Sequence, residues 1–402
     1  MRNVVRGIAV GLAVVLTACG GGASPGTSAS TNTYQGKTIQ FGAILSLTGA
    51  GGVYGPSSKN GIDLAVEQIN AAGGVNGATI TVTTQDDASI KQQSAQVAQT
   101  LIQQGNLLAL LGPTLSNSAV AVHPLAESFK IPILAVSTTG INIVPDCNYP
   151  NMTPCTYVFR DSLGEESAIP ANIMVYSQNA HPKTGVLMVA NDDKFSSDGG
   201  KIVAATVGKY GIQLLDTVEF SKTTADFATP VTRALQKHPD VIFITSLGGI
   251  PATIMIEARK QGFTGQFLGG NGFNTAKVSK QAGAAGKGAQ SGSAWYINNT
   301  FTSNAEFVKS YRAKYGSDPD QFAAQGFAAI KILADSARRA NLTFSDVAGD
   351  RTRLRDAMET VNVNTPLGPF QFTSTHDVRQ TIWIIQMDGS GGFTLVQPVK
   401  PS

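Results

Sequence analysis

Charged residues are scarce in this chain of 402 residues. Asp, Glu, Lys and Arg make up 14% of it, and the formal net charge is only +3. A nucleic-acid-binding protein normally presents a clustered basic face, so we expect no nucleic-acid partner. Three cysteines are too few for a disulfide-dense scaffold or a four-thiolate zinc module. The four histidines are scattered and form no H-E-x-x-H motif, so we expect no metal site.

The chain also lacks a hydrophobic run long enough to span a bilayer. The apolar run at 8–16 falls well short of the about 20 residues that a membrane-spanning helix needs. Arg2 and Arg6 precede this run and small residues follow it, which is the pattern of a secretion signal. The sequence Leu-Thr-Ala-Cys that ends at Cys19 resembles the lipobox of bacterial lipoproteins, whose cysteine is lipidated and becomes the first residue. We therefore expect a signal peptide at 1–18 and a lipid on Cys19; the alternative is an ordinary signal peptide with a chance cysteine.

The segment after Cys19 is rich in Gly, Ser, Thr and Ala. Such a composition cannot bury enough apolar surface to fold, so we interpret residues 19–37 as a flexible tether. These features together predict a protein of the cell envelope that is anchored by its lipid on the extracytoplasmic side of a membrane.

The other two cysteines, Cys147 and Cys155, are close together in the sequence. Export brings them into an oxidising compartment, where such a pair is expected to form a disulfide. Two unpaired thiols are the alternative. A metal site is disfavoured because no histidine lies nearby in the sequence.

Beyond Thr38, β-rich runs alternate with helical spacing, and the pattern restarts after the cysteine loop. The expected strands cover residues 38–46, 79–85, 107–111, 133–137, 156–160, 186–189, 212–220, 241–245 and 266–268. The expected helices cover residues 59–72, the region around 94–101, 119–129, 166–178, 199–210, 227–236, 250–261, 306–315, 321–340 and 352–361. Two successive series of this kind predict an α/β fold of two doubly wound parallel-sheet lobes.

Two later segments do not follow the alternation. Residues 381–387 and 393–396 flank a turn at Asp388 to Gly391, which predicts a closing hairpin. The stretch 281–293 is rich in Gly, Ala and Ser, and we expect it to lie at the surface.

Motifs for catalysis are missing: the chain contains no G-x-S-x-G elbow and no Walker loop. A glycine-rich loop does follow the first strand, and Asp86 ends the second strand, which is the context of a dinucleotide site. However, Tyr54 stands where the third glycine of G-x-G-x-x-G belongs, and Asp86-Asp87 is typical of a turn. We therefore expect a protein that is not an enzyme and needs no cofactor; a secreted NAD(P)-dependent oxidoreductase is the alternative.

Several motifs resemble the type I periplasmic binding fold, and more narrowly the branched-chain amino-acid (Leu/Ile/Val) receptors of ABC importers. They are LSLTGAGGVYG, KNGIDLAVEQINAAGGVNG, TQDDAS, LLGPTLSNSAVAVHPLAESFKIPILAVSTT, DVIFITSLGGIPATIMIEARKQGF, FLGGNGF and TPLGPFQF. The resemblance extends from 38 to 396. It implies two lobes joined by three crossovers, with the ligand in the cleft between them. The first lobe would comprise 38–159 plus 296–374, and the second 160–295 plus 375–402.

The resemblance also implies which residues hold the ligand. The position that matches Ser116, which follows Leu115 in a loop, binds the ligand carboxylate in this family. Ser116 precedes an expected helix that starts near Ser118, and the free N–H groups of a helix N-terminus suit an anion. The loop that contains Ser137 and Thr138 matches the one that takes the polar end of the ligand, and Tyr54 matches an aromatic residue that covers it.

The second lobe departs from the family pattern at three positions. Phe195 and Leu247 stand where the family commonly has tyrosines, and Asn271 replaces an acid that pairs with the α-ammonium group of the ligand. An amide is a poorer partner for a buried cation than a carboxylate. This pattern disfavours leucine, isoleucine and valine, and it favours an amide, an aromatic or aliphatic carboxylate, or another amino-acid-like metabolite.

The predicted function is that of a lipid-anchored binding protein that captures a small molecule by hinge closure and delivers it to an ABC permease. A ligand-sensing receptor that is not coupled to import is the alternative from another functional class.

Overall fold

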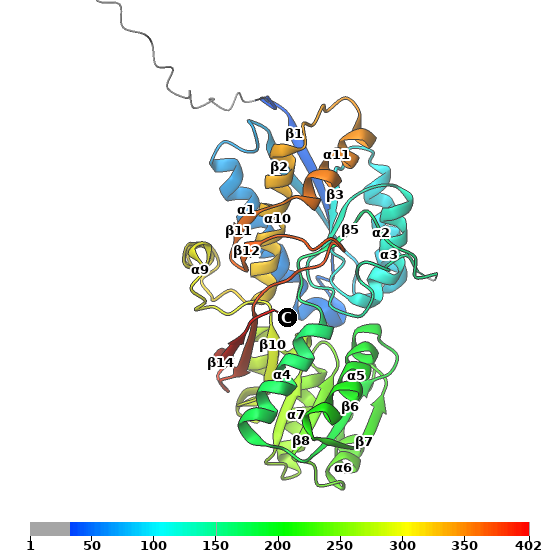
Figure 1. The fold of residues 1–402 in the computed structure, drawn as a ribbon, viewed down its shortest axis with the longest axis vertical. Helices are drawn as coiled ribbons and strands as arrows, with labels where there is room; N and C mark the ends of the chain where they lie inside the picture. The colour runs from blue at the N-terminus through cyan, green and yellow to red at the C-terminus, as the bar shows by residue number, and fades with distance from the viewer. Residues whose placement is uncertain (1–32, 150, 402) are drawn as a thin grey trace, which may run out of the picture.

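The computed structural model of the protein describes residues 33–149 and 151–401. Within these ranges the chain forms a five-stranded sheet, a seven-stranded sheet and a small two-stranded sheet. Figure 1 shows two units stacked end to end, and we call each large sheet with its helices a lobe. The predicted signal peptide, Cys19 and the tether up to residue 32 lie outside the described residues. Among the described helices, none combines the length and apolar character needed to cross a bilayer.

The first lobe is built on parallel strands in the order β2-β1-β3-β4-β5. These are β1 (Thr38–Leu45), β2 (Thr79–Asp86), β3 (Ala109–Leu111), β4 (Ile133–Ala135) and β5 (Val158–Arg160). The helices are α1 (Gly55–Ala71), α2 (Lys91–Gln103), α3 (Ser116–Ser128), α9 (Thr302–Tyr315), α10 (Gln321–Arg339) and α11 (Val347–Glu359), and β11 (Val363–Thr365) pairs with β12 (Gly368–Phe370).

Alternation along the strands divides the core of this lobe into two layers. In β1, Phe41 packs with residues of α1, α10 and α11, whereas Ile44 faces α2 and α3. Successive side chains of a strand point to opposite faces, so a parallel sheet covered on both sides needs apolar residues at nearly every position. In α10, Ile330, Leu333, Ala334 and Ala337 form an apolar stripe at helical spacing, and all four are buried in the first layer.

The second lobe contains a mixed sheet in the order β14-β13-β10-β9-β8-β6-β7. The strands are β6 (Thr184–Ala190), β7 (Gln213–Phe220), β8 (Val241–Thr245), β9 (Gln266–Gly269), β10 (Gln290–Ser293), β13 (Ile382–Met387) and β14 (Phe393–Val399). Helices α4 (Glu165–Ala180) and α5 (Lys194–Val207) cover one face, and α6 (Ala228–Leu235), α7 (Ile250–Lys260) and α8 (Ala276–Ala282) cover the other. The predicted α/β class is confirmed, and the predicted hairpin supplies the antiparallel strands β13 and β14.

The prediction that 281–293 lies at the surface is wrong. Its last four residues form β10, a buried strand between β9 and β13. The strand is polar, and its hydroxyls find partners inside: Ser291 donates to Asn274, and Ser293 donates to Gln321 at 2.7 Å. Small polar residues are buried here because hydrogen bonds satisfy them, which a composition-based interpretation does not detect.

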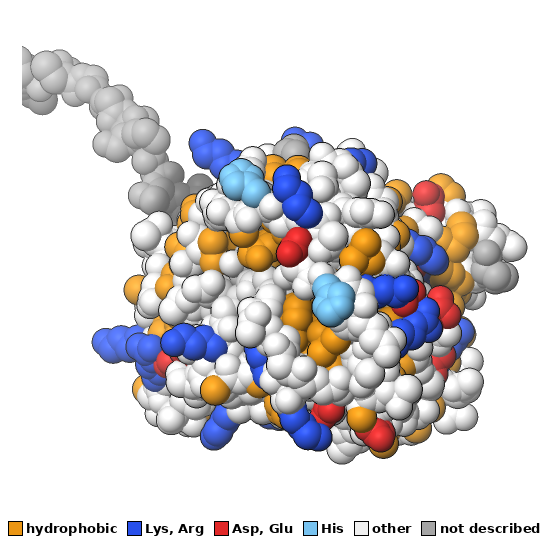
Figure 2. All heavy atoms as spheres, turned by 90° about the horizontal axis from the view of Figure 1, so that it is seen from below, with side chains coloured by type: hydrophobic (Ala, Val, Ile, Leu, Met, Phe, Trp, Pro, Cys, Tyr) orange, Lys and Arg blue, Asp and Glu red, His pale blue; other side chains and the backbone are white. Residues whose placement is uncertain are grey.

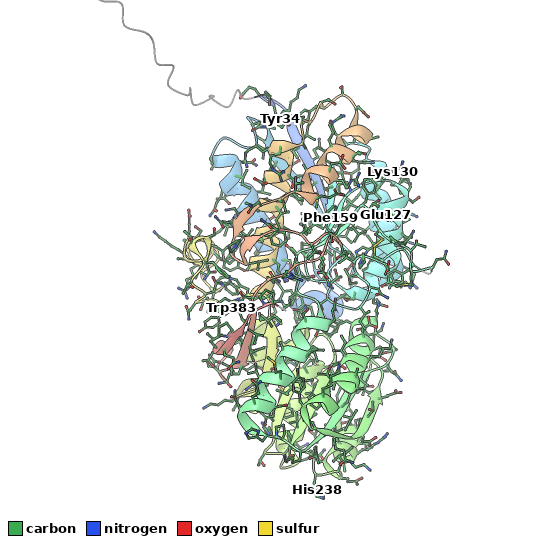
Figure 3. All side chains as sticks on the ribbon, in the orientation of Figure 1. Tyr34, Glu127, Lys130, Phe159, His238 and Trp383 are labelled. Carbon is green, nitrogen blue, oxygen red and sulfur yellow. A yellow bond between two sulfur atoms is a disulfide. The ribbon has the colours of Figure 1, made fainter. Side chains whose placement is uncertain are left out.

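Two predicted boundaries need correction. Arg160 pairs with Ala135 as the last residue of β5, so it belongs to the first lobe rather than the second. Tyr34 was assigned to the tether, yet it is only 4% exposed. Its hydroxyl accepts from Leu342 N at 2.9 Å, and its ring lies 5.1 Å from that of Phe344, at the end of the first lobe where Figure 3 labels it. The folded part therefore begins at least as early as Tyr34.

The chain passes between the lobes three times: from β5 to α4, from β10 to α9, and from β12 to β13. Arg160 joins the first and third of these crossovers. Its guanidinium contacts Asp377 in a two-pronged ion pair and also Glu166 at 2.7 Å, while its side chain is 1% exposed. The crossovers are thus fixed to one another by charge-assisted hydrogen bonds.

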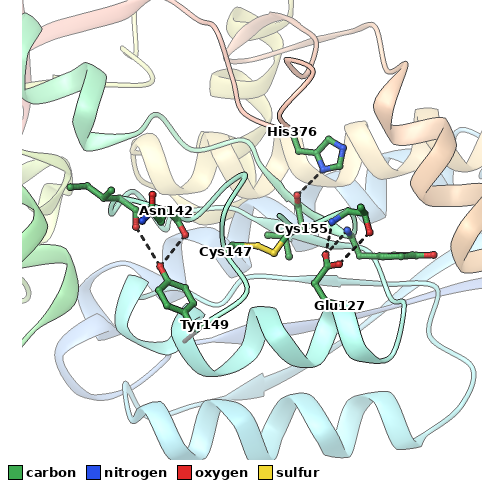
Figure 4. The surroundings of a disulfide bond; sticks show 10 residues. Glu127, Asn142, Cys147, Tyr149, Cys155 and His376 are labelled. Carbon is green, nitrogen blue, oxygen red and sulfur yellow. Dashed lines mark hydrogen bonds between the residues drawn. A yellow bond between two sulfur atoms is a disulfide. The ribbon is translucent and has the colours of Figure 1, made fainter. Parts of the chain in front are cut away.

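A disulfide joins Cys147 to Cys155, as the sequence led us to expect. Figure 4 shows the bridged loop beside α3, held on both sides. The Tyr149 hydroxyl donates to Asn142 O at 2.9 Å, and Glu127 of α3 accepts from Thr156 N at 2.9 Å. The bridge therefore fixes a loop that continues directly from the end of β4.

Replacing both bridged cysteines, Cys147→Ser with Cys155→Ser, should lower the free energy of unfolding by about 2–3 kcal/mol, because the short closed loop no longer restricts the unfolded chain. Urea denaturation followed by circular dichroism measures this change. Reduction and alkylation of the wild type should reproduce the shift, and the double variant should not respond to reductant. An unchanged midpoint in both experiments would contradict the stabilising role of the bridge.

Candidate functional site

The first strand-to-helix loop places Tyr54 between the lobes. Its glycines let the 3-10 turn η1 (Gly49–Val53) and the start of α1 lie directly on the end of β1, since a Cβ at Gly55 would come within 2.1 Å of Ser46 O. Asp86 and Asp87 fasten this loop by accepting from Leu47 N at 2.9 Å and from the Ser46 hydroxyl at 2.6 Å. The glycines therefore serve close packing, and the two acids hold the turn.

The Tyr54 hydroxyl connects the two lobes. It donates to Gly272 O at 3.1 Å and accepts from Gly248 N at 3.0 Å, both in the second lobe. Its ring packs on Phe322 of α10 with 4.8 Å between centroids. The side chain is buried, and this burial raises the pKa of the Tyr54 phenol well above its usual range. Tyr54 is therefore a neutral donor and acceptor held between the lobes.

Helix α3 directs its N-terminus into the same space. It begins at Ser116, with Leu115 as the N-cap residue, and no side chain caps it. The Ser116 hydroxyl accepts from Gly140 N at 3.1 Å. An uncapped helix N-terminus presents backbone N–H groups and partial positive charge, which together favour an anion.

The loop after β4 contains two of the predicted ligand-binding residues, and only one of them lies at the site. Ser137 lies at the site, and its hydroxyl donates to Thr114 O at 2.8 Å. Thr138 is fully buried beside the crossover, where its carbonyl accepts from the Ser162 hydroxyl at 2.7 Å, and it does not line the cavity.

The second lobe contributes Phe195 from the first turn of α5, Leu247 from the loop after β8, and Asn271 from the 3-10 turn η3 (Asn271–Phe273). The Asn271 side chain donates to Ser137 O at 3.4 Å and accepts from the Gln321 amide. It thus also joins the two lobes, and both partners of its side chain are uncharged.

These residues enclose one small cavity between the lobes. Its lining residues are Tyr54, Thr114, Leu115, Ser116, Ser137, Phe195, Leu247, Asn271 and Phe322. Its volume is about 10 Å³, which is room for about one water molecule. Any ligand larger than water therefore requires the lobes to move apart or these side chains to rotate. In the described part of the chain, no lining residue is charged.

Sequence reasoning missed two lining residues, Thr114 and Phe322. Thr114 stands in the same loop as Ser116, and its hydroxyl accepts from Ser46 N at 2.9 Å. Phe322 comes from the first turn of α10, far along the chain, where the sequence reads as an ordinary apolar helix position. Only the tertiary contact with Tyr54 marks it as part of the site.

A wider hollow of about 680 Å³ lies elsewhere, at the far end of the second lobe next to His181 and His238. Figure 3 labels His238 at this end, and Figure 2 views the molecule from the same side. There, Lys and Arg side chains stand apart from one another, with Asp and Glu side chains among them. None of the predicted ligand-binding residues lines this hollow.

Comparison with known proteins agrees with this geometry. A family model described as "Periplasmic binding protein" matches residues 38–392. The chain belongs to this family. The resemblance drawn from the sequence motifs is thereby confirmed.

Individual relatives are distant but match nearly the whole length. An amino acid binding protein of Pseudomonas aeruginosa is 23% identical over 375 residues, which cover 90% of this chain and 93% of that protein. The branched-chain amino acid transporter substrate-binding protein LivJ of Streptococcus pneumoniae, solved with isoleucine, has a TM-score of 0.80 at 24% identity and covers 91% of this chain and 100% of its own. A solute-binding protein of an ABC transporter from R. palustris, solved with benzoate, has a TM-score of 0.79 at 21% identity. The match covers 90% of this chain and 97% of that protein. At these identities the structural likeness establishes the fold.

One buried acid of this periplasmic binding protein was missed from the sequence. Glu165, the first residue of α4, accepts from Asn271 N at 2.7 Å and from the Thr139 hydroxyl at 3.3 Å. Burial raises the pKa of Glu165 to about 8, and the hydrogen bond from Asn271 N only partly opposes the shift. Glu165 is therefore protonated near neutral pH.

This shift predicts a pH-dependent stability. A glutamate in the unfolded chain titrates near pH 4.3, so between that pH and about 8 the folded state keeps a proton that the unfolded state has lost. The free energy of unfolding should therefore fall as pH rises through this window, by up to about 1.4 kcal/mol per pH unit, and level off above it. Chemical denaturation across pH measures the slope, which Glu165→Gln should reduce. Glu306→Gln, on exposed α9, should leave the slope unchanged, and an equal slope in wild type and Glu165→Gln would contradict the assignment.

Removing the Tyr54 hydroxyl should loosen the contact between the lobes. In Tyr54→Phe, Gly248 N and Gly272 O lose their partner when the lobes close, which disfavours the closed arrangement by about 1–3 kcal/mol. Small-angle X-ray scattering should show a larger radius of gyration. Tyr34→Phe is the matched control, because its hydroxyl also makes two backbone hydrogen bonds, but within one lobe. Equal radii for wild type and Tyr54→Phe would contradict the bridging role.

Proposed function

We propose that this periplasmic binding protein captures a small carboxylate with an apolar body between its lobes and delivers it to an ABC permease. The observation that carries the proposal is the lining of the cavity: an uncapped helix N-terminus stands among uncharged, largely apolar side chains.

The carboxylate end of the ligand would meet α3. The carboxylate would accept hydrogen bonds from the free backbone N–H groups at the start of α3, and the Ser116 hydroxyl keeps its own proton available because it acts as an acceptor from Gly140 N. Hydrogen bonds to a charged acceptor are stronger than neutral ones, and the helix dipole adds to them.

An α-ammonium group has no anionic partner at this site. No lining residue of the described chain is an acid, and Asn271 presents an amide where the family pattern has a carboxylate. Glu165 lies behind Asn271, but its raised pKa leaves it neutral, and its Oε1 already accepts from Asn271 N. Burying a cation without an anion is strongly unfavourable, which favours a ligand without the amino group.

The body of the ligand would pack among Tyr54, Phe195, Leu247 and Phe322. These side chains suit an aromatic ring or a branched alkyl chain, since apolar and aromatic walls supply most of the affinity in such sites. Proteins of the same fold have been solved with isoleucine and with benzoate, which share this combination of a carboxylate and an apolar body.

Capture would proceed by hinge closure about the three crossovers. A ligand shifts the population toward the closed state by contacts that it makes only when both lobes touch it. We further propose that Cys19 carries the lipid anchor and that the closed form delivers its ligand to the permease. The two moving lobes would be 34–160 plus 296–374 and 161–295 plus 375–402, which are the predicted ranges with Tyr34 and Arg160 assigned to the first lobe. A ligand-sensing receptor remains the second functional class, and uptake by cells that lack the protein distinguishes the two.

A matched pair of ligands tests the ligand class. Leucine and 4-methylpentanoate differ only by the α-ammonium group, so the protein should bind 4-methylpentanoate at least about tenfold more tightly, which is 1.4 kcal/mol. Benzoate should bind and benzamide should bind more weakly, because the amide carries no charge for α3. Isothermal titration calorimetry measures all four ligands, and tighter binding of leucine or of benzamide would overturn the proposal.

Two variants locate the binding. Ser116→Ala should weaken the binding of the carboxylate ligand by about 1 kcal/mol, because one hydrogen bond is lost. Ser128→Ala, at the exposed opposite end of the same helix, is the control and should change nothing. Asn271→Asp should reverse the preference in favour of leucine by supplying the missing anion. Unchanged affinities in both Ser116→Ala and Asn271→Asp would place the ligand elsewhere.

A further inference from the structure

A second cavity between the lobes lies beside α9, apart from the cleft at Tyr54. Its volume is about 470 Å³, within the range of pockets that hold small molecules. The first lobe contributes Asp318 and Asp320 from the α9–α10 connection and Gln321 from the start of α10. The second lobe contributes Asp388 and Phe393 from the β13–β14 hairpin. Figure 1 shows α9 and β14 on the same side of the molecule, where one crossover runs between them.

The chemistry of this second cavity differs from that of the cleft. Its walls include the aromatic rings of Trp295, Tyr296 and Phe393, together with three carboxylates and a single cation, Arg312. Arg312 is already paired with Asp318, which leaves two carboxylates uncompensated. The stems of Lys280 and Lys287 pack against the hairpin turn, but neither residue lines the cavity.

The two remaining carboxylates are held in place by neutral donors. Asp320 is 8% exposed and accepts from the Ser57 hydroxyl at 3.0 Å and from Ala323 N at 3.1 Å. Asp388 accepts from Ser390 N at 2.7 Å and from Gly392 N at 3.0 Å. Fixed carboxylates beside aromatic rings form the environment that attracts an organic cation, by charge and by the negative faces of the rings.

We propose that this cavity is a second binding site, for a small organic cation such as a quaternary or primary amine. The site is distinct from the ligand cleft of the proposed function and stands independently of it.

Gln321 connects the second site to the cleft. Its Oε1 accepts from Asn274, from Ser293 at 2.7 Å and from Ala294 N at 2.8 Å, and its amide donates to Asn271 in the cleft. Because both lobes line the second site, a cation that contacts both favours their closed arrangement. By linkage, such a cation and the cleft ligand strengthen each other's binding.

The test is a fluorescence titration with choline. The chain has two tryptophans; Trp295 lines the cavity, and the ring of Trp383 lies 6.1 Å from that of Tyr296. Choline should change this fluorescence saturably, with millimolar or tighter affinity, whereas its uncharged isostere 3,3-dimethylbutan-1-ol should not. No saturable response to choline, or an equal response to the isostere, overturns the proposal.

Variants assign the response to the site. Asp320→Asn removes a charge but keeps the helix cap, since asparagine caps a helix as well as aspartate does. This variant should bind choline at least about tenfold more weakly. Asp346→Asn makes the same change at the cap of α11, away from the cavity, and should have no effect. Ser390→Arg, at an exposed turn position of the wall, introduces a cation without disturbing buried groups and should also weaken choline. Unchanged choline affinity in Ser390→Arg overturns the proposal even if Asp320→Asn does not fold.

Ser116→Ala separates the second site from the proposed function. It should leave the choline titration unchanged whatever it does to carboxylate binding. Loss of choline binding in this variant would place the cation in the cleft and overturn the second site.

Discussion

The hydroxyl group of Tyr54 is the contact on which the relation between the two lobes depends. It reaches from the first lobe to a backbone donor and a backbone acceptor of the second, Gly248 N and Gly272 O. Both partners belong to loops at strand ends, so the two hydrogen bonds form only at a particular placement of one sheet relative to the other. A buried phenol can satisfy both only when the lobes are close, and leaving either unsatisfied is unfavourable. The same loop glycines that let η1 lie on β1 bring Tyr54 to this position. A loop of small residues thus places the hydroxyl that joins the lobes, and an apolar cluster that includes Leu115, Phe322 and Leu247 surrounds its ring.

Neutral hydrogen bonds and charged side chains both cross the cleft: the Asp198 carboxylate accepts from Ile141 N at 3.1 Å, and the Lys277 ammonium donates to Gly52 O at 3.0 Å. Asn271, Ser137 and Gln321 connect the lobes through amides and carbonyls. The ion pairs of Arg160 with Asp377 and Glu166 hold the crossovers, where the chain must bend but not separate. Neutral hydrogen bonds contribute about 1 kcal/mol each, so they can break and re-form as the lobes move, whereas charge-assisted ones are stronger. The neutral contacts across the cleft are therefore the easiest ones to break when the lobes separate.

Most of the fold could be predicted because the signals are local. Apolar runs such as β8 and the stripe of α10 carry their periodicity in a few consecutive residues, and parallel sheets require such runs. The predictions that were wrong concern segments whose burial has no local signal in the sequence. The strand β10 is polar, and its burial depends on Asn274 and Gln321, which belong to other segments. Tyr34 stands in a polar segment, and its partners Ala337 and Leu342 are about three hundred residues away. Single residues of this kind are recognised only once the tertiary contacts are known.

The residues of the candidate site likewise fall into those that the sequence could predict and those that it could not. Ser116, Ser137 and Leu247 follow strands, and the carboxyl ends of parallel strands converge on a cleft, so sequence order alone brings them together. Phe322 and Glu165 stand at the first turns of helices, where no sequence pattern distinguishes a residue at the cleft from one at the surface. The effect of Glu165 is also hidden, because burial keeps it neutral and turns an acid into a hydrogen-bonding support for Asn271. The charge of this cleft is therefore set by the surroundings of its residues as much as by their identity, and a carboxylate in the sequence does not imply an anion at the site.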